Sequence, residues 1–336
     1  MKFVLILISL ISFVVTLFVV PVLIPIARKL GCMDMPGLRR FHKHPTPRWG
    51  GVSFFLGVAA TLFFWDLDRG TAAYLTAASL LIIIGMRDDI RSLGWKVKFT
   101  GTFAAATILI FGGKVVVGHL GSYGNFGRVE LGVFSVAFTY VAVAGVTNAI
   151  NLIDGLNGLA GGISLIAFLI MGIAAVVAGN AQVAIICFAF VGALAGFLRY
   201  NFPKANIFMG DSGSLFLGFS LAVVSILLTQ NDTHRVPPML PVLVLLIPIF
   251  DTIRVMLIRL FKGRNPFKAD KTHLHHLIVR QRYSCITSVI FLWLFTAFCG
   301  VIALSLVKYT SVQYAIVTLF LSLMLSFFTA SLVTRR

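Results

Sequence analysis

The sequence predicts an all-α integral membrane protein, a bundle of about 11 transmembrane helices forming one domain over residues 1–336. Three observations predict this fold class. Of the 336 residues, 59% are hydrophobic and only 12% are charged, against roughly a quarter charged in an ordinary soluble domain. The apolar residues gather in runs close to the roughly 20 residues that a helix needs to cross a bilayer. Neither a sequence repeat nor a low-complexity tract interrupts this pattern.

The candidate spans follow one another along the chain with mostly short connections. The first is too long for the apolar core of a signal peptide and has no small-residue cleavage site, so we expect it to be retained. The second and third are short, and a single hairpin is the alternative interpretation of that region. We expect spans at residues 3–27, 50–65, 71–86, 99–117, 131–147, 159–178, 181–198, 213–228, 237–253, 286–307 and 311–333.

The basic residues predict the orientation of the bundle. An odd number of spans places the two termini on opposite sides, and Lys and Arg concentrate in cytoplasmic connections. Of the 28 Lys and Arg residues, all but six fall on the side that holds the C-terminus and the long segments 28–49 and 254–285. We therefore expect a periplasmic N-terminus and a cytoplasmic C-terminus. The net charge of +17 is then explained by basic cytoplasmic loops, and it also suits phosphate-bearing ligands. It does not indicate binding of nucleic acid.

Polar residues are costly inside membrane helices and usually functional. The first such cluster is Asp88-Asp89, at the end of the third span. Consecutive carboxylates point about 100° apart on a helix, so one could hold a metal or a basic group while the other serves a substrate. The alternative is a solvated helix end, paired with the neighbouring Arg87 and Arg91.

The second cluster follows the fifth span. Asn148, Asn151 and Asp154 step by three and are neighbours on a helix, and their amides and carboxylate suit a metal, a phosphate or a sugar. Gly155 and Gly158 would let a ligand approach the backbone. No Gly-Lys-Ser/Thr follows, so this is not a P-loop. The alternative is polar contact between packed helices.

The third cluster surrounds Asp211, between Gly210 and Gly213 at the start of an apolar helix. This position suits either a helix cap or a divalent cation with phosphates near a helix N-terminus. Asp251, three residues before Arg254, is expected mainly to form an ion pair at a helix end.

The fourth cluster places three of the seven histidines, His273, His275 and His276, in the basic segment 254–285. Clustered histidines suit zinc, but no Cys or Glu lies near them, and hydrogen bonding to phosphate fits equally well. The alternative is a solvated basic loop on lipid headgroups.

All four clusters lie on the cytoplasmic side of the expected topology. An all-Asp site with basic residues fits Mg²⁺-dependent phosphoryl chemistry better than zinc hydrolysis, because Mg²⁺ takes one or two carboxylates plus substrate phosphate oxygens. A site at the cytoplasmic face of the membrane suits a reaction between a water-soluble phosphate compound and a lipid.

Four motifs in this order resemble the polyprenyl-phosphate N-acetylhexosamine-1-phosphate transferases, over nearly the whole chain. The separated histidines resemble the WecA and TagO branch, whereas MraY enzymes usually carry three consecutive histidines. The motifs are Asp88-Asp89, the run from Asn148 to Gly162, the run from Phe208 to Gly218 (FMGDSGSLFLG), and His273-x-His275-His276.

The resemblance implies a site with bound Mg²⁺, for which Mn²⁺ is a substitute. One position departs from the pattern, because many bacterial members carry Asp where this chain has Asn157. The implied metal ligands are Asp211, Asn151 and Asp89; the implied catalytic residues are Asp88, Asp89, Asp154, His273, His275 and His276; the implied substrate-binding residues are Lys98, Asn148, Asn151, Asn157 and Lys271.

The resemblance further implies an enzyme of the bacterial cytoplasmic membrane that works at the cytoplasmic face. It would transfer N-acetylglucosamine 1-phosphate from a UDP-sugar to undecaprenyl phosphate, release UMP and initiate a lipid-linked glycan of the cell envelope, such as lipopolysaccharide or teichoic acid. Its expected partners are the UDP-sugar, the lipid acceptor and the bilayer, with a homodimer left open. An MraY-like phospho-N-acetylmuramoyl-pentapeptide transferase is the alternative, and an ion-coupled transporter is a remote one.

Overall fold

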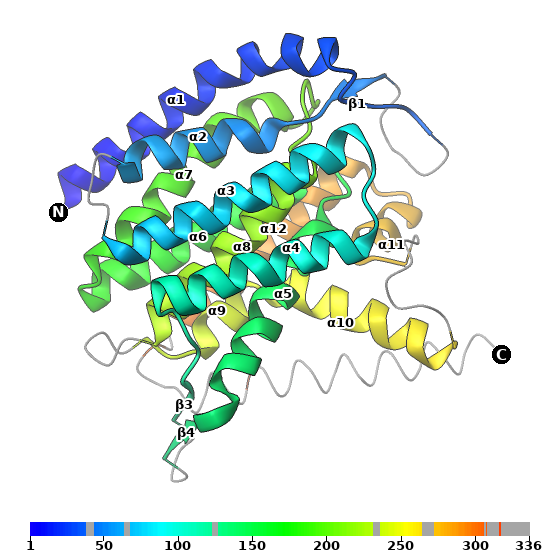
Figure 1. Cartoon of the computed structure of the whole chain (residues 1–336). Coiled ribbons are helices and arrows are strands. Elements are labelled where there is room, and N and C mark those ends of the chain that lie inside the picture. Colours follow the sequence, from blue (N-terminus) through cyan, green and yellow to red (C-terminus); the bar gives the residue numbers. More distant parts are fainter. Residues whose placement is uncertain are drawn as a thin grey trace.

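The computed structural model describes residues 1–37, 44–63, 68–122, 127–230, 236–263, 272–305, 307 and 316. The described chain is a helical bundle (Figure 1), which confirms the predicted helical class. Two short antiparallel hairpins, β1–β2 and β3–β4, are additions that the sequence did not predict. Their strands are β1 (Met33–Asp34), β2 (Thr46–Pro47), β3 (His119–Ser122) and β4 (Arg128–Glu130).

The helices follow the predicted runs in order, with several changes at their ends. The helices are α1 (Lys2–Lys29), α2 (Gly50–Phe63), α3 (Arg69–Ile90), α4 (Trp95–Thr107, extended by a π-helical turn Ile108–Gly112), α5 (Ser135–Ile153), α6 (Leu159–Ala178), α7 (Ala181–Asn201), α8 (Gly210–Thr229), α9 (Met239–Val244), α10 (Leu246–Phe261), α11 (Leu274–Arg280) and α12 (Cys285–Ser305).

Seven of the described helices are long and apolar enough to cross a bilayer, so the chain is a multi-pass membrane protein. These seven are α1, α3, α5 with the short turn before it, α6, α7, α8 and α12. The expected short second span is a helix of its own, α2, and the expected span at 237–253 is divided into α9 and α10 at Leu245. The expected span at 311–333 lies outside the described residues, apart from residue 316.

Two helices extend further into polar sequence than the apolar runs predicted. Helix α3 continues through Asp88 and Asp89 to Ile90, and α5 continues through Asn148 and Asn151 to Ile153. Hydropathy marks where apolar residues stop, whereas a helix continues while its polar side chains have partners inside the protein. The first two polar clusters therefore lie mainly on the last turns of rigid helices.

Helix α8 forms the centre of the bundle and packs on α2, α3, α5 and α6. Small residues allow the backbones near its start to touch. A Cβ atom at Gly85 of α3 would lie 2.3 Å from the Cα of Ser212, and one at Gly51 of α2 would lie 2.1 Å from the Cα of Gly213. Such small-residue contacts are typical of membrane helices. They bring the last turn of α3 against the first turn of α8.

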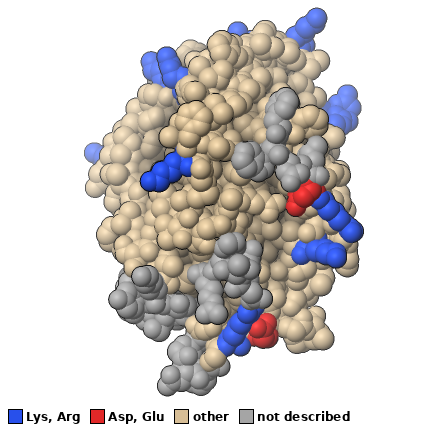
Figure 2. Space-filling model, turned by 90° about the vertical axis from the view of Figure 1, so that its left-hand side faces the viewer, with Lys and Arg blue, Asp and Glu red and all other residues tan. Residues whose placement is uncertain are grey.

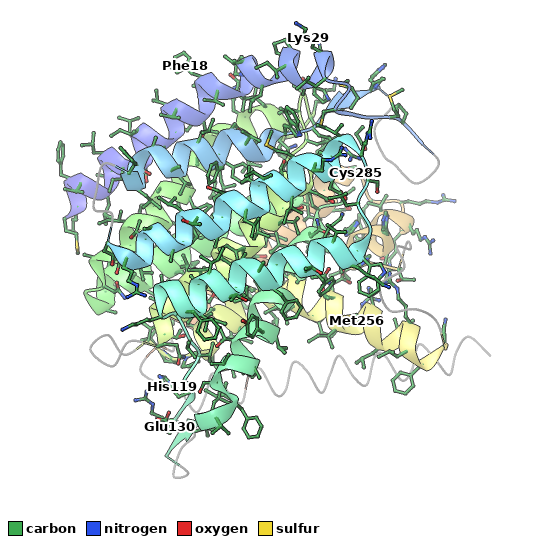
Figure 3. The ribbon with its side chains drawn as sticks, in the orientation of Figure 1. Phe18, Lys29, His119, Glu130, Met256 and Cys285 are labelled. Carbon is green, nitrogen blue, oxygen red and sulfur yellow. The ribbon has the colours of Figure 1, made fainter. Side chains whose placement is uncertain are left out.

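The two ends of the bundle differ in composition. The polar end gathers the ends of α3 and α5 and the starts of α4 and α8, with α11 beside them (Figure 1). The opposite end carries the β3–β4 hairpin, which includes His119 and Glu130 (Figure 3). Figure 2 views that opposite end, where uncharged residues dominate and basic side chains are scattered. The acids that the sequence singled out are thus gathered at one end only.

Candidate active site

Asp89, on the last turn of α3, binds the N-terminus of α8. Its Oδ1 accepts a hydrogen bond from the backbone amide of Asp211 at 2.8 Å, and its Oδ2 accepts from the Ser212 hydroxyl at 2.8 Å and the Ser212 amide at 3.2 Å. Gly210 has a φ of 71°, and a Cβ there would lie 2.3 Å from Asp89 Oδ2. The carboxylate therefore satisfies amides that a helix start leaves without partners.

Its neighbour Asp88 points to a different partner, as expected for adjacent residues on a helix. Lys98 Nζ lies 3.0 Å from Asp88 Oδ2 and also donates to Asp211 Oδ2, so one ammonium joins two carboxylates. With two carboxylates as its ion-pair partners, the lysine is held in its charged form in the site.

Asn151 completes the surroundings of Asp211. Its Nδ2 donates to Asp211 Oδ1 at 2.9 Å and to the Ser214 hydroxyl at 2.7 Å. Asn148, one turn earlier on α5, lies on the wall of a neighbouring cavity. Asp154 ends α5, and burial together with the charges of Asp211 and Asp89 raises the pKa of its carboxyl to about 7.

The three clustered histidines occupy three different environments. His273 Nδ1 lies 2.8 Å from Asp251 Oδ2, and His276 lines a cavity shared with Asp211. His275 is buried, and neither ring nitrogen has a hydrogen-bond partner among the described residues. Burial and the nearby His276 lower the pKa of His275 to about 3, so its ring is neutral. Lys271, just before this run, lies outside the described residues.

His275 packs directly on the glycine-rich turn after α5. A Cβ atom at Gly155 would lie 2.2 Å from His275 Nε2, so this contact requires a glycine. Asp251 holds the histidine helix in place, because its Oδ1 accepts from Arg254 Nη2 at 2.7 Å and from the Leu274 amide at 2.8 Å. The predicted ion pair of Asp251 with Arg254 is confirmed. Asp251 also contacts His273, which is 22 residues away in sequence, so local spacing could not predict this contact.

Two cavities meet at this end of the bundle. The larger, about 430 Å³, is polar, and its wall includes Asp34, Asp88, Asp89, Asp154, Asn157 and Asp211. The smaller, about 170 Å³, is mainly apolar, and its wall includes Leu93, Trp95, Phe99, Leu152, Leu215 and Met256. Among the described residues, Lys98 alone lines both cavities. We call them the polar cavity and the apolar cavity.

Asp34 and Arg48 are the site residues that sequence reasoning missed. Neither residue interrupts an apolar helix, so the hydropathy pattern does not mark them as candidates. Arg48 counts only among the basic residues that predict the orientation. In the structure, Arg48 pairs with Asp34 and its Nη1 lies 3.7 Å from Asp89 Oδ1. Both residues line the polar cavity.

The described side chains of this site fit a metal ion whose coordination is completed by phosphate oxygens of the substrate. They do not form a site in which the protein supplies every ligand. Among the described residues no group of three or more His, Cys, Asp or Glu side chains could hold a metal ion. Mg²⁺, however, is usually bound by one or two carboxylates together with phosphate oxygens. Asp88 and Asp211, joined by Lys98 on the polar cavity, could supply those carboxylates. Metal binding by Asp211, Asp89 and Asn151 stays a prediction.

The fold and the site together define a class of protein: a multi-pass helical membrane protein with a lysine-bridged carboxylate site where a polar and an apolar cavity meet. Comparison with known proteins agrees with this class. Residues 71–229, which carry α3 to α8 and three of the four motifs, match the model of glycosyl transferase family 4.

Relatives extend this similarity over most of the chain. It is 33% identical over 264 residues to the undecaprenyl-phosphate alpha-N-acetylglucosaminyl 1-phosphate transferase of Escherichia coli K12, covering 77% of this chain and 72% of that protein. It is 34% identical over 291 residues to the probable undecaprenyl-phosphate N-acetylglucosaminyl 1-phosphate transferase of Bacillus subtilis, covering 84% and 80%. The chain belongs to glycosyl transferase family 4 and is an enzyme, a membrane-embedded sugar-1-phosphate transferase.

Proposed function

We propose that this enzyme transfers N-acetylglucosamine 1-phosphate from UDP-N-acetylglucosamine to undecaprenyl phosphate and releases UMP. The position of Lys98, on the walls of both cavities, carries this proposal. A reaction between a water-soluble diphosphate and a lipid phosphate needs a polar and an apolar binding site that share one point. The named activity of the similar bacterial proteins supports the same acceptor and sugar.

The donor binds in the polar cavity and the acceptor in the apolar one. Leu93, Trp95 and Met256 give the apolar cavity a surface that suits the first isoprene units of the lipid. Its phosphate then lies at Lys98, whose ammonium is charged because two carboxylates surround it. Asp154, Asn157 and His276 present hydrogen-bonding groups to the nucleotide sugar.

In the reaction, an oxygen of the lipid phosphate attacks the phosphorus that carries the sugar. The new oxygen–phosphorus bond forms as the bridging bond of the diphosphate breaks, and the electron pair leaves with UMP. A phosphate monoester has its second pKa near about 6, so the acceptor is largely dianionic at neutral pH. Asp154, whose pKa is about 7, accepts the remaining proton. Bound Mg²⁺, for which Mn²⁺ can substitute, would be held by Asp88 and Asp211 and would neutralise charge on the diphosphate.

The site faces the cytoplasm in a bundle of eleven spans. Besides the seven long helices, α2, α4 with its π-helical turn, the α9–α10 pair and the apolar run 311–333 supply the other four. A reporter that is active only in the periplasm, fused after Arg336, should remain inactive in the bacterial cytoplasmic membrane. Strong reporter activity would contradict this orientation.

Purified protein tests the reaction directly. With undecaprenyl phosphate and Mg²⁺ it should release UMP from UDP-N-acetylglucosamine, and EDTA should stop the release. UDP-muramoyl-pentapeptide should be a poor donor, and faster turnover of that donor would favour the MraY-like alternative. A transporter is disfavoured because the acids gather at one end of the bundle and not at its midplane. Light scattering of the same sample in detergent tests whether the enzyme is a homodimer.

A further inference from the structure

The segment between the β1–β2 hairpin and α2 crosses over the start of α8. The amide of Phe208 donates to the carbonyl of Pro47 at 2.8 Å, and the amides of Gly50 and Gly51 donate to the carbonyls of Phe208 at 2.8 Å and Met209 at 2.9 Å. These hydrogen bonds tie residues 47–51 to the residues just before Asp211. The backbone on both sides of Arg48 is therefore fixed relative to the acidic cluster.

The next residue, Trp49, anchors the same segment through its buried side chain. Its φ of 79° is unusual for a residue with a side chain. Its ring is buried in a small cluster with Ala27 and Cys32 and does not line the polar cavity. Arg48 lines the polar cavity instead, so the crossing segment places one cation there from a rigid backbone.

The guanidinium of Arg48 has hydrogen-bonding capacity that the protein does not use. It donates to Asp34, and within the part of the chain that the structure describes this is its one hydrogen bond. A guanidinium carries five N–H donors in a fork that matches phosphate oxygens. The side chain is 25% exposed, and it borders the same cavity as Asp154 and Asp211.

The charge on the cavity wall favours such a cation in addition to the proposed Mg²⁺. Five carboxylates line the polar cavity, and among the described residues Arg48 and Lys98 are the two Lys or Arg side chains that oppose them. A diphosphate would be repelled by this wall unless cations contact it. Lys98 also lines the apolar cavity, whereas Arg48 does not. The two cations therefore differ in which substrate they can reach.

We propose that Arg48 binds the diphosphate of the nucleotide-sugar donor and that Asp34 is the positioning residue that aims it. This inference rests on the proposed function, because it takes the donor to be the ligand of the polar cavity. Arg48 contacts the donor alone, while Lys98 contacts both substrates. The hairpin after α1, which carries no acid-rich motif, thus contributes to donor binding.

The test compares Arg48→Gln and Arg48→Lys with the wild type in the full-length detergent-purified enzyme. Arg48→Gln should raise the KM for UDP-N-acetylglucosamine about 10-fold to 100-fold, because a charge-assisted hydrogen bond to phosphate is lost. The KM for undecaprenyl phosphate should stay within about twofold, since that substrate does not meet Arg48. Arg48→Lys should recover only part of the donor affinity, because an ammonium cannot form the bidentate contact.

Equilibrium binding distinguishes a phosphate contact of Arg48 from a purely structural role in holding the hairpin. Arg48→Gln should weaken the binding of UDP and leave the binding of uridine unchanged. Asp34→Asn should weaken UDP binding less, since the guanidinium remains. Arg28→Gln, at an exposed arginine near the end of α1, is the matched control and should change neither.

Equal loss of UDP and uridine binding, or unchanged UDP affinity with lower thermal stability, would show that Arg48 only holds the hairpin. If Arg48→Gln fails to fold, the ratio of UDP to uridine affinity in Arg48→Lys decides the same question. A wild type that binds UDP but does not turn over UDP-N-acetylglucosamine would contradict the proposed function. In that case the binding ratios would still confirm or overturn the role of Arg48.

Discussion

The two cavities that meet at Lys98 are built in different ways. Residues from the β1–β2 hairpin, α3, α4, α7, α8, α11 and neighbouring connections, including the turn after α5, line the polar cavity, and hydrogen bonds and ion pairs fix several of them. The apolar cavity is lined largely by side chains of α4, α5 and α10, which interact mainly through van der Waals contact. A reaction between charged groups needs fixed dipoles, whereas a flexible lipid chain needs only a surface. Substitutions should therefore have large effects in the polar cavity and small effects in the apolar one.

The largest effect is expected at Asp211. Asp211→Asn removes a carboxylate that Lys98 and Asn151 both orient, and it should lower kcat by about a hundredfold or more. Circular dichroism should show unchanged helix content, because the backbone amide bonded to Asp89 remains. Near-normal turnover would mean that Asp211 only caps α8.

Lys98 should show the next largest effect, and it should affect both substrates. Lys98→Met removes the cation between Asp88 and Asp211 and leaves their charges opposed, so kcat/KM should fall about 10-fold to 100-fold for donor and lipid alike. Steady-state kinetics with each substrate varied in turn would measure this. A defect confined to one substrate would contradict the placement of Lys98 between the cavities.

The neighbours Asp88 and Asp89 form a matched pair. Asp89→Asn removes an acceptor from the start of α8 and should lower stability, by about 1–3 kcal/mol, as loss of a buried charged hydrogen-bond partner does. Asp88→Asn should mainly lower kcat. Thermal unfolding in detergent and UMP release measure the two effects. Identical defects in both assays would contradict this division.

Asp154 should set a pH dependence within the polar cavity. Its carboxyl has a pKa of about 7, so the ionised fraction rises as pH rises through neutrality. If the ionised form accepts the proton, kcat/KM should increase between about pH 6 and pH 8 and then level off. Asp154→Asn should remove this step from the profile. Persistence of the step in the variant would assign it to another group.

The smallest effect is expected in the apolar cavity. Met256→Gln, on α10 (Figure 3), places an amide on the surface proposed for the lipid and should raise the KM for undecaprenyl phosphate about threefold to tenfold. The KM for the donor should not change. Leu260→Gln, at an exposed position on the same helix, is the control. An equal effect of both substitutions would remove the apolar cavity from the acceptor site.

Local sequence predicted much of the fold. The expected span at 159–178 coincides with α6, because apolar residues fill that helix from end to end. The end of α3 was predicted four residues early, since the helix continues through Asp88 and Asp89. Most of the expected site residues lie together at one end of the bundle, although Lys271 is outside the described residues. Asp34 and Arg48 were missed because a short hairpin outside the spans carries no hydropathy signal.

The sequence by itself determined that the chain is a helical membrane protein and which polar residues were candidates, because hydropathy and polar interruptions are local properties. Only the tertiary structure decided which of those residues meet. Lys98 and Asp211 are 113 residues apart, and Asp89 and Asp211 are 122 apart, yet each pair is in contact. Close packing of α3 and α8 at Gly85 and Ser212 brings them together. That packing depends on complementary shape between distant helices, which no local pattern encodes.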